Sequence, residues 1–232
     1  MSREVEISSP VGVPPIGVLS AAYRAFEDVV AHVDEGRSGL PSACAGWSVR
    51  DLVYHCLGDA RRGLVALHTP TRREPDRDAV TYWRDWRPDP AAASDSTALP
   101  RAATTLLPSY SDLRDECLET FAALRHAAER VAPEIPVATQ GHSLTAGDLL
   151  RTLAVEATIH HLDLQASLPG TPGPCREGLA EVRRTLDGLL GRPAPSAWDD
   201  AHYARAATGR AALSAADRAA LGEDAPRFPL FV

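Results

Sequence analysis

The segment from Val155 to Gln165, VEATIHHLDLQ, places acids and histidines inside an otherwise apolar helical pattern. Glu156 and His160 are four residues apart, so on a helix they lie one turn apart on the same face. Burying a carboxylate without a partner costs free energy. An imidazole and a carboxylate at this spacing can both reach one divalent metal ion, which would offset that cost.

A second helical pattern contributes a histidine of the same kind. Leu52, His55 and Asp59 are spaced by three and four residues and so share one helix face. If both faces point into one interior, His55, Glu156 and His160 converge. Two histidines and a glutamate that leave one coordination position open are typical of catalytic zinc. The competing interpretation treats the histidines as ordinary core residues, with Glu156 paired only to His160.

Four more residues are candidates for supporting roles near the metal. His142, just before the last long helical pattern, and His161 are candidate catalytic residues. Asp59 and Asp163 each lie one turn from a metal histidine, where an acid can orient the imidazole. The competing interpretations are a structural contact for His161 and a solvated or capping carboxylate for Asp163.

The aromatic stretch TYWRDW, residues 81–86, could form a pocket wall. Within it, Trp83 and Arg84 are candidate substrate-binding residues, since an arginine near the metal would stabilise a developing oxyanion. Packing of the aromatic rings into the core is the competing interpretation.

Long helices must position these residues, and the hydrophobic spacing predicts four of them. Ser48 is a good N-cap for the second, with Asp51 in a capping-box position. A long connection, residues 69–108, separates the second helix from the third. This order predicts an all-α fold built on a four-helix bundle with a crossover between its second and third helices. The four predicted helices cover residues 16–33, 48–68, 111–131 and 145–168.

The chain is expected to divide near the Pro- and Gly-rich residues 169–174. Residues 1–170 form the bundle in this interpretation. Residues 171–232 form a short, mostly helical C-terminal appendage that packs on it, with helices over 176–190, 201–210 and 214–222.

Composition narrows the function classes. The chain has 232 residues, 44% of them hydrophobic, and a net charge of −7, which argues against nucleic acid and against an anionic membrane surface. It lacks an apolar run of about 20 residues that could span a bilayer. The four cysteines form no CxxC pair, and no leader pattern precedes them, so we expect reduced thiols in a cytoplasmic protein, as a monomer or homodimer.

Three stretches resemble a known family. SACAGWSVRDLVYHCLGD and LLRTLAVEATIHHLDL are similar to its two metal-binding motifs, and ATGRAALSAADRAALGEDAPRFPLF to a C-terminal signature of related actinobacterial proteins. The chain resembles the DinB-like superfamily, specifically relatives of mycothiol-dependent maleylpyruvate isomerase. The resemblance covers most of the chain, with both metal motifs in the family's order.

The resemblance implies a DinB-like bundle that binds a divalent metal, zinc in the isomerase, through His55, Glu156 and His160. It also implies a thiol cosubstrate, mycothiol in actinobacteria. The C-terminal region is shorter and more helical than a full second domain, which leaves the maleylpyruvate substrate open.

These observations predict a metal-dependent, mycothiol-dependent transferase or isomerase that acts on a small electrophile through a metal-bound thiolate. A thiol that coordinates a metal loses its proton, and the thiolate is the nucleophile. Two alternatives stay open. One is a metal-dependent hydrolase in which water replaces the thiol, and the other is a non-catalytic bundle that binds a metal or small ligand.

Overall fold

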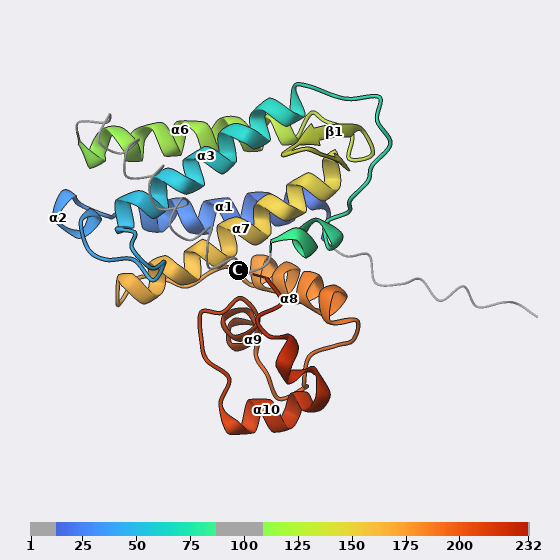
Figure 1. The fold of residues 1–232 in the computed structure, drawn as a ribbon. Coiled ribbons are helices and arrows are strands. Elements are labelled where there is room, and N and C mark those ends of the chain that lie inside the picture. The colour runs from blue at the N-terminus through green and yellow to red at the C-terminus, as the bar shows by residue number, and fades with distance from the viewer. Residues whose placement is uncertain (1–12, 87–108, 232) are drawn as a thin grey trace, which may run out of the picture.

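A computed structural model describes residues 13–86 and 109–231, and four long helices dominate it (Figure 1). Helix α1 packs mainly on α7, and α3 packs on both α6 and α7. This arrangement confirms the predicted four-helix bundle; residues 87–108 of the predicted crossover lie outside the described residues. No helix within the described ranges is long and apolar enough to cross a membrane. The bundle helices are α1 (Pro15–Val30), α3 (Val49–Leu67), α6 (Tyr110–Ala128) and α7 (Ala146–Ser167).

Side-chain caps fix where the two helices that carry the candidate metal ligands begin. At the start of α3, Ser48 accepts a hydrogen bond from the Asp51 N–H, and the Asp51 carboxylate accepts one from the Ser48 N–H. At the start of α7, Thr145 accepts a hydrogen bond from the Asp148 N–H. Each cap satisfies backbone donors that the first turn leaves unpaired. The predicted N-caps at Ser48 and Thr145 are therefore confirmed.

Helix α7 is buried on nearly all of its faces. One side faces the bundle core, and the other side packs Val155, Ile159 and Leu162 into a second apolar cluster with the C-terminal segment. Polar side chains on α7 therefore lie in the interior and need partners there.

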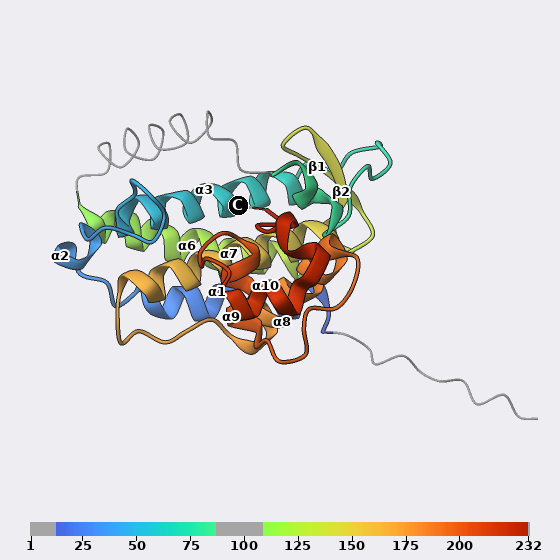
Figure 2. The ribbon, with the colours of Figure 1, turned by 60° about the horizontal axis from the view of Figure 1, so that its bottom comes forward.

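The C-terminal segment supplies α8 (Arg176–Leu190), α9 (Asp200–Ala207) and α10 (Ala215–Leu221). Helix α8 packs against α7 and α1, and α9 also contacts α7. Figures 1 and 2 show these helices lying along the flank of the bundle. Three short helical elements complete the described chain, namely α2 (Glu35–Ser38), η1 (Thr81–Asp85) and η2 (Gly222–Arg227).

A small hairpin before α7 is absent from the sequence expectations. Strand β1 (Pro136–Thr139) pairs antiparallel with β2 (His142–Thr145). Each strand has four residues, too few for a recognisable alternation of apolar and polar side chains. The hairpin places its turn at Gln140 and Gly141 beside the cleft described below.

We expect that a larger side chain cannot be packed at Gly63, where α3 contacts α6 and α7. A Cβ there would lie 2.8 Å from Leu153 Cδ1 and 3.1 Å from Leu124 Cδ1. Gly63→Val should lower the free energy of unfolding by about 1–3 kcal/mol through overpacking. The matched change Gly58→Val on the same helix, where the nearest atom is 3.9 Å away, should stay within about 0.5 kcal/mol. Urea unfolding of both variants checks this, and equal losses would contradict it.

Candidate metal centre

Helices α3 and α7 bring His55, Glu156 and His160 together. One potential ligand atom from each lies within 4.8 Å of the other two. The two imidazole rings are nearly perpendicular, at 81°, with centroids 4.8 Å apart. His160 Nε2 lies 3.6 Å from Glu156 Oε2. The three residues predicted as metal ligands thus form one cluster at the α3–α7 contact.

The orientation of His160 is held by Asp163. This carboxylate is 2% exposed and lies 3.0 Å from His160 Nδ1. It also accepts two hydrogen bonds of 2.8 Å from the guanidinium of Arg210. Burial alone would raise the pKa of Asp163, but the bonds from His160 and Arg210 hold it well below its ordinary value. An ionised carboxylate only accepts hydrogen bonds, so His160 Nδ1 carries a proton and Nε2 is left to bind a metal.

Asp59 lies beside the other histidine. Its Oδ2 is 3.1 Å from His55 Nε2, and its Oδ1 pairs with Arg62. Burial lowers the pKa of His55, but the hydrogen bond and charge of Asp59 outweigh this, so the pKa is raised above 6.5. A histidine must lose the proton from its ligand nitrogen to bind a metal, so the raised pKa makes metal binding by His55 compete with protonation.

The negative charge of Glu156 is unfavourable in its surroundings unless a cation lies nearby. Burial raises its pKa, and the nearby charge of Asp59 raises it further. A divalent ion between Glu156 and the two imidazoles would relieve this repulsion. Zinc accepts two imidazoles and one carboxylate as ligands and then keeps one coordination position open. The residues therefore fit a divalent metal ion.

His161 and His142, which were predicted as catalytic residues, are not part of this cluster. His161 points away from it: the ring is buried edge-on to Phe26, and its Nε2–H donates to the Pro172 carbonyl at 3.0 Å. That placement matches the structural interpretation of His161. His142 lies on β2 with its Nδ1 3.3 Å from Asp76 Oδ1, outside the metal cluster.

The two residues predicted in the aromatic stretch lie apart from the metal cluster as well. Trp83 is buried and stacks on Phe231 with ring centroids 4.5 Å apart, which is the core-packing alternative. Arg84 is exposed. In this stretch it is Tyr82, the neighbouring residue, that lines the cleft beside Glu156.

Two partners of Asp163 were not singled out from the sequence. Cys44 donates its S–H to Asp163 Oδ2 at 3.3 Å. Burial and the charge of Asp163 raise the pKa of Cys44 to about 12, so it stays a thiol. Arg210 is 47 residues from Asp163 in the chain. Both lie inside stretches that carry the family resemblance, and that was the one signal that could have found them.

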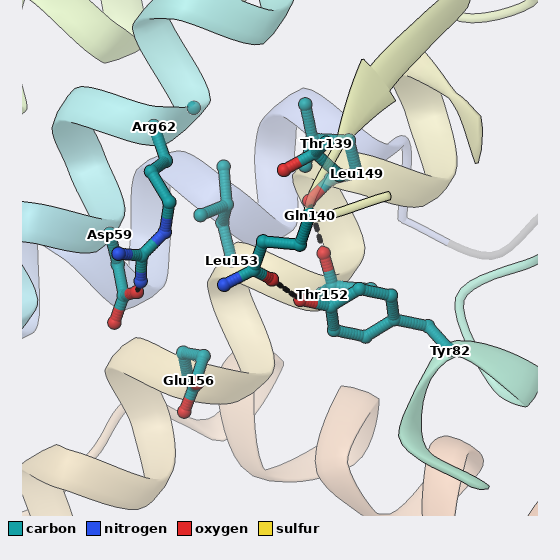
Figure 3. Close-up of a pocket in the computed structure, with 10 residues that line it drawn as sticks. Asp59, Arg62, Tyr82, Thr139, Gln140, Leu149, Thr152, Leu153 and Glu156 are labelled. Carbon is teal, nitrogen blue, oxygen red and sulfur yellow. Dashed lines mark hydrogen bonds and ion pairs between the residues drawn. The ribbon is translucent and has the colours of Figure 1, made fainter. Parts of the chain in front are cut away.

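A small cleft opens beside the cluster (Figure 3). Asp59 and Glu156 form one part of its wall, with Arg62 nearby. Tyr82 and Gln140 join across the opposite part through a hydrogen bond from the tyrosine hydroxyl to the amide oxygen. A small molecule in this cleft would therefore contact Glu156, one of the three candidate ligands, directly.

The family model of the mycothiol maleylpyruvate isomerase N-terminal domain matches residues 19–165. The chain belongs to this family. The matched region contains all three residues of the metal cluster and Asp163, but it ends before Arg210. The arginine that completes the Asp163 network is thus supplied by the segment beyond the family domain.

Two solved structures share the fold. They are crystal structures of the mycothiol-dependent maleylpyruvate isomerase and of a point mutant of it, with TM-scores of 0.53 and 0.54 and sequence identities of 17% and 18%. Each match covers 78% of this chain and 72% of the other. At this identity the likeness shows a common fold. No curated protein matches the chain.

We expect Arg210 to support both the fold and metal binding. Arg210→Gln would leave the buried Asp163 carboxylate short of its cationic partner and should cost about 3–5 kcal/mol of unfolding free energy. Since Asp163 would hold His160 less firmly, metal affinity should fall about 10- to 100-fold. Arg205→Gln is the matched control, because Arg205 pairs with the neutral Gln165. Urea unfolding and competitive zinc titration measure both; unchanged zinc affinity in folded Arg210→Gln would contradict the role.

His161 should act on stability rather than on metal binding. Burial holds its pKa below the ordinary 6.5, so on acidification the unfolded chain takes up a proton that the folded chain does not. Stability from this group is present above pH 6.5 and is lost as the pH falls below it. His161→Phe should remove this part of the acid sensitivity. The unfolding free energies of both proteins are measured between pH 7.5 and about 5. The difference between them should change in favour of the variant as the pH falls. A constant difference would contradict the assignment.

Proposed function

We propose that the protein is a metal-dependent enzyme that uses a low-molecular-weight thiol, mycothiol, to isomerise or conjugate a small electrophile. The observation that carries the proposal is the cluster of His55, Glu156 and His160, of which Glu156 lines a cleft, in a chain of the mycothiol maleylpyruvate isomerase domain family. The two structural neighbours are named for a mycothiol-dependent isomerase, which supports the same reaction class. The proposal places the enzyme in the cytoplasm of an actinobacterial cell, where such thiols stay reduced.

The three cluster residues would hold the ion, and zinc suits their chemistry. When bound, the ion supplies a Lewis acid that lowers the pKa of a thiol far below its free value of about 8.5. The protein's own contribution is orientation. Asp163 keeps the proton of His160 on Nδ1, and Arg210 keeps Asp163 ionised. The ring of Trp47 packs against His55 with ring centroids 5.1 Å apart.

The proposed reaction needs no oxidant, because the electron pairs of the bonds that form and break account for each step. For isomerisation, the thiolate sulfur forms a bond to one alkene carbon and the π electrons move onto a conjugated carbonyl. Rotation follows about the former double bond, and the C–S bond then breaks to return the thiolate. For conjugation, the same C–S bond forms while a leaving group departs with its electron pair. In both cases the cleft must hold the electrophile beside the sulfur.

Measuring the metal content tests whether the proposed ligands bind an ion. We expect about one zinc ion per wild-type chain, a loss of stoichiometric metal in His160→Ala, and weaker binding in Glu156→Gln. His126→Ala, which changes an exposed histidine on α6, should leave the metal content unchanged. Full metal in His160→Ala would remove the proposed ligand set.

Thiol dependence tests the reaction. Zinc-loaded protein should bind mycothiol in calorimetry more tightly than glutathione or cysteine, and it should turn over maleylpyruvate when mycothiol is present. Turnover should persist below pH 8.5 and stop when a chelator removes the ion. Thiol-independent turnover of any substrate would favour the hydrolase, and metal binding with neither thiol binding nor turnover would favour the binding protein.

A further inference from the structure

The hairpin turn beside the cleft contains a residue in an unfavourable backbone conformation. Thr139 pairs with His142, so Gln140 and Gly141 form a two-residue turn. Both have positive φ, 47° for Gln140 and 84° for Gly141. Asparagine, aspartate or glycine usually occupies the first position of such a turn, because other side chains are strained there. Strain of this kind is common where a side chain has a task at a functional site.

The side chain of Gln140 extends from this turn to the cleft (Figure 3). The Tyr82 hydroxyl donates a hydrogen bond to its amide oxygen. Tyr82 itself is 8% exposed and packs edge-on against Trp83 at 5.2 Å. The tyrosine therefore holds the oxygen end of the amide group.

This orientation leaves the amide nitrogen as a donor in the cleft. In Figure 3 the nitrogen points into the space above Glu156 and away from Tyr82. Within residues 13–86 and 109–231 no protein acceptor takes a hydrogen bond from it. Gln140 is exposed at the rim, so a molecule that enters the cleft would meet this N–H group next to the metal cluster.

We infer that Gln140 is a substrate-binding residue whose amide N–H donates a hydrogen bond to an oxygen of the electrophile. The oxygen is a carbonyl or carboxylate oxygen close to the carbon that the thiolate attacks. Negative charge develops on that oxygen when the sulfur adds, so a fixed donor stabilises the addition. This inference rests on the proposed function, and Tyr82 is the residue that positions the amide.

Ligand binding to cobalt-substituted protein tests the inference without turnover. Acetate and ethanethiol are titrated separately, and the visible absorption of the cobalt ion reports binding. Acetate has oxygens that can accept a hydrogen bond from Gln140, whereas ethanethiol has none. In Gln140→Gly the acetate Kd should rise about three- to tenfold, as expected for one neutral hydrogen bond. The ethanethiol Kd should stay within about twofold.

Stability provides a second, independent readout. A purely structural glutamine would support the hairpin through Tyr82, and its loss would lower the thermal midpoint. We expect Gln140→Gly to hold or raise the midpoint, because glycine adopts the positive φ without strain. Gln140→Asn, which also tolerates this conformation but is one methylene shorter, should lose acetate affinity in the same way. Tyr82→Phe should lose part of it.

An unchanged acetate Kd in both Gln140→Gly and Gln140→Asn would overturn the inference, as would a midpoint that falls together with both affinities. The proposed function fails separately. If wild-type protein shows no mycothiol-dependent turnover but its acetate affinity depends on Gln140, the thiol chemistry is wrong and the oxygen-binding role stands.

Discussion

The charge of Asp163 has to be neutralised inside the protein, and the candidate metal site is arranged around that requirement. Its carboxylate lies on a helix that is buried on nearly all faces, so water cannot solvate it. Its partners come from the loop before α3, from α7 itself and from the segment after α9: Cys44, His160 and Arg210. The fold of three separate chain segments and the protonation of one metal histidine thus depend on the same ionised group.

Because α7 is buried, the candidate site depends on the C-terminal segment that covers this helix. In a free four-helix bundle, the outer face of α7 would meet solvent. Here α8 and α9 cover that face with apolar side chains, and the chain after α9 returns Arg210 to Asp163. The family match, which ends at residue 165, therefore contains the candidate ligands but not Arg210, whose charge holds Asp163 and through it His160 in place.

Local spacing was sufficient to pair Glu156 with His160, because the two lie one turn apart on a helix. Grouping His55 with them needed the family resemblance, since His55 lies on another helix. Local spacing could not show Arg210, since the contact with Asp163 depends on how α8 and α9 pack. It also missed the hairpin, whose strands are too short to show a period, and therefore missed Gln140. Residue type alone did not decide between roles for His161 and Trp83, because only packing determines which side of an element meets the cleft.

Charge balance gives a reason for the pairing pattern around the metal cluster. Asp59 is paired with Arg62 and Asp163 with Arg210, and among the described residues Glu156 is the cluster acid with no such arginine. A divalent ion held by Glu156 and two neutral imidazoles would therefore leave one net positive charge. A single thiolate neutralises that charge, whereas an uncharged ligand does not. If Asp59 and Asp163 were unpaired, their fields would cancel the ion's attraction for an anionic sulfur. Under the proposed function, the two arginines would therefore preserve an ion's electrostatic preference for a thiolate, although neither arginine is a proposed ligand.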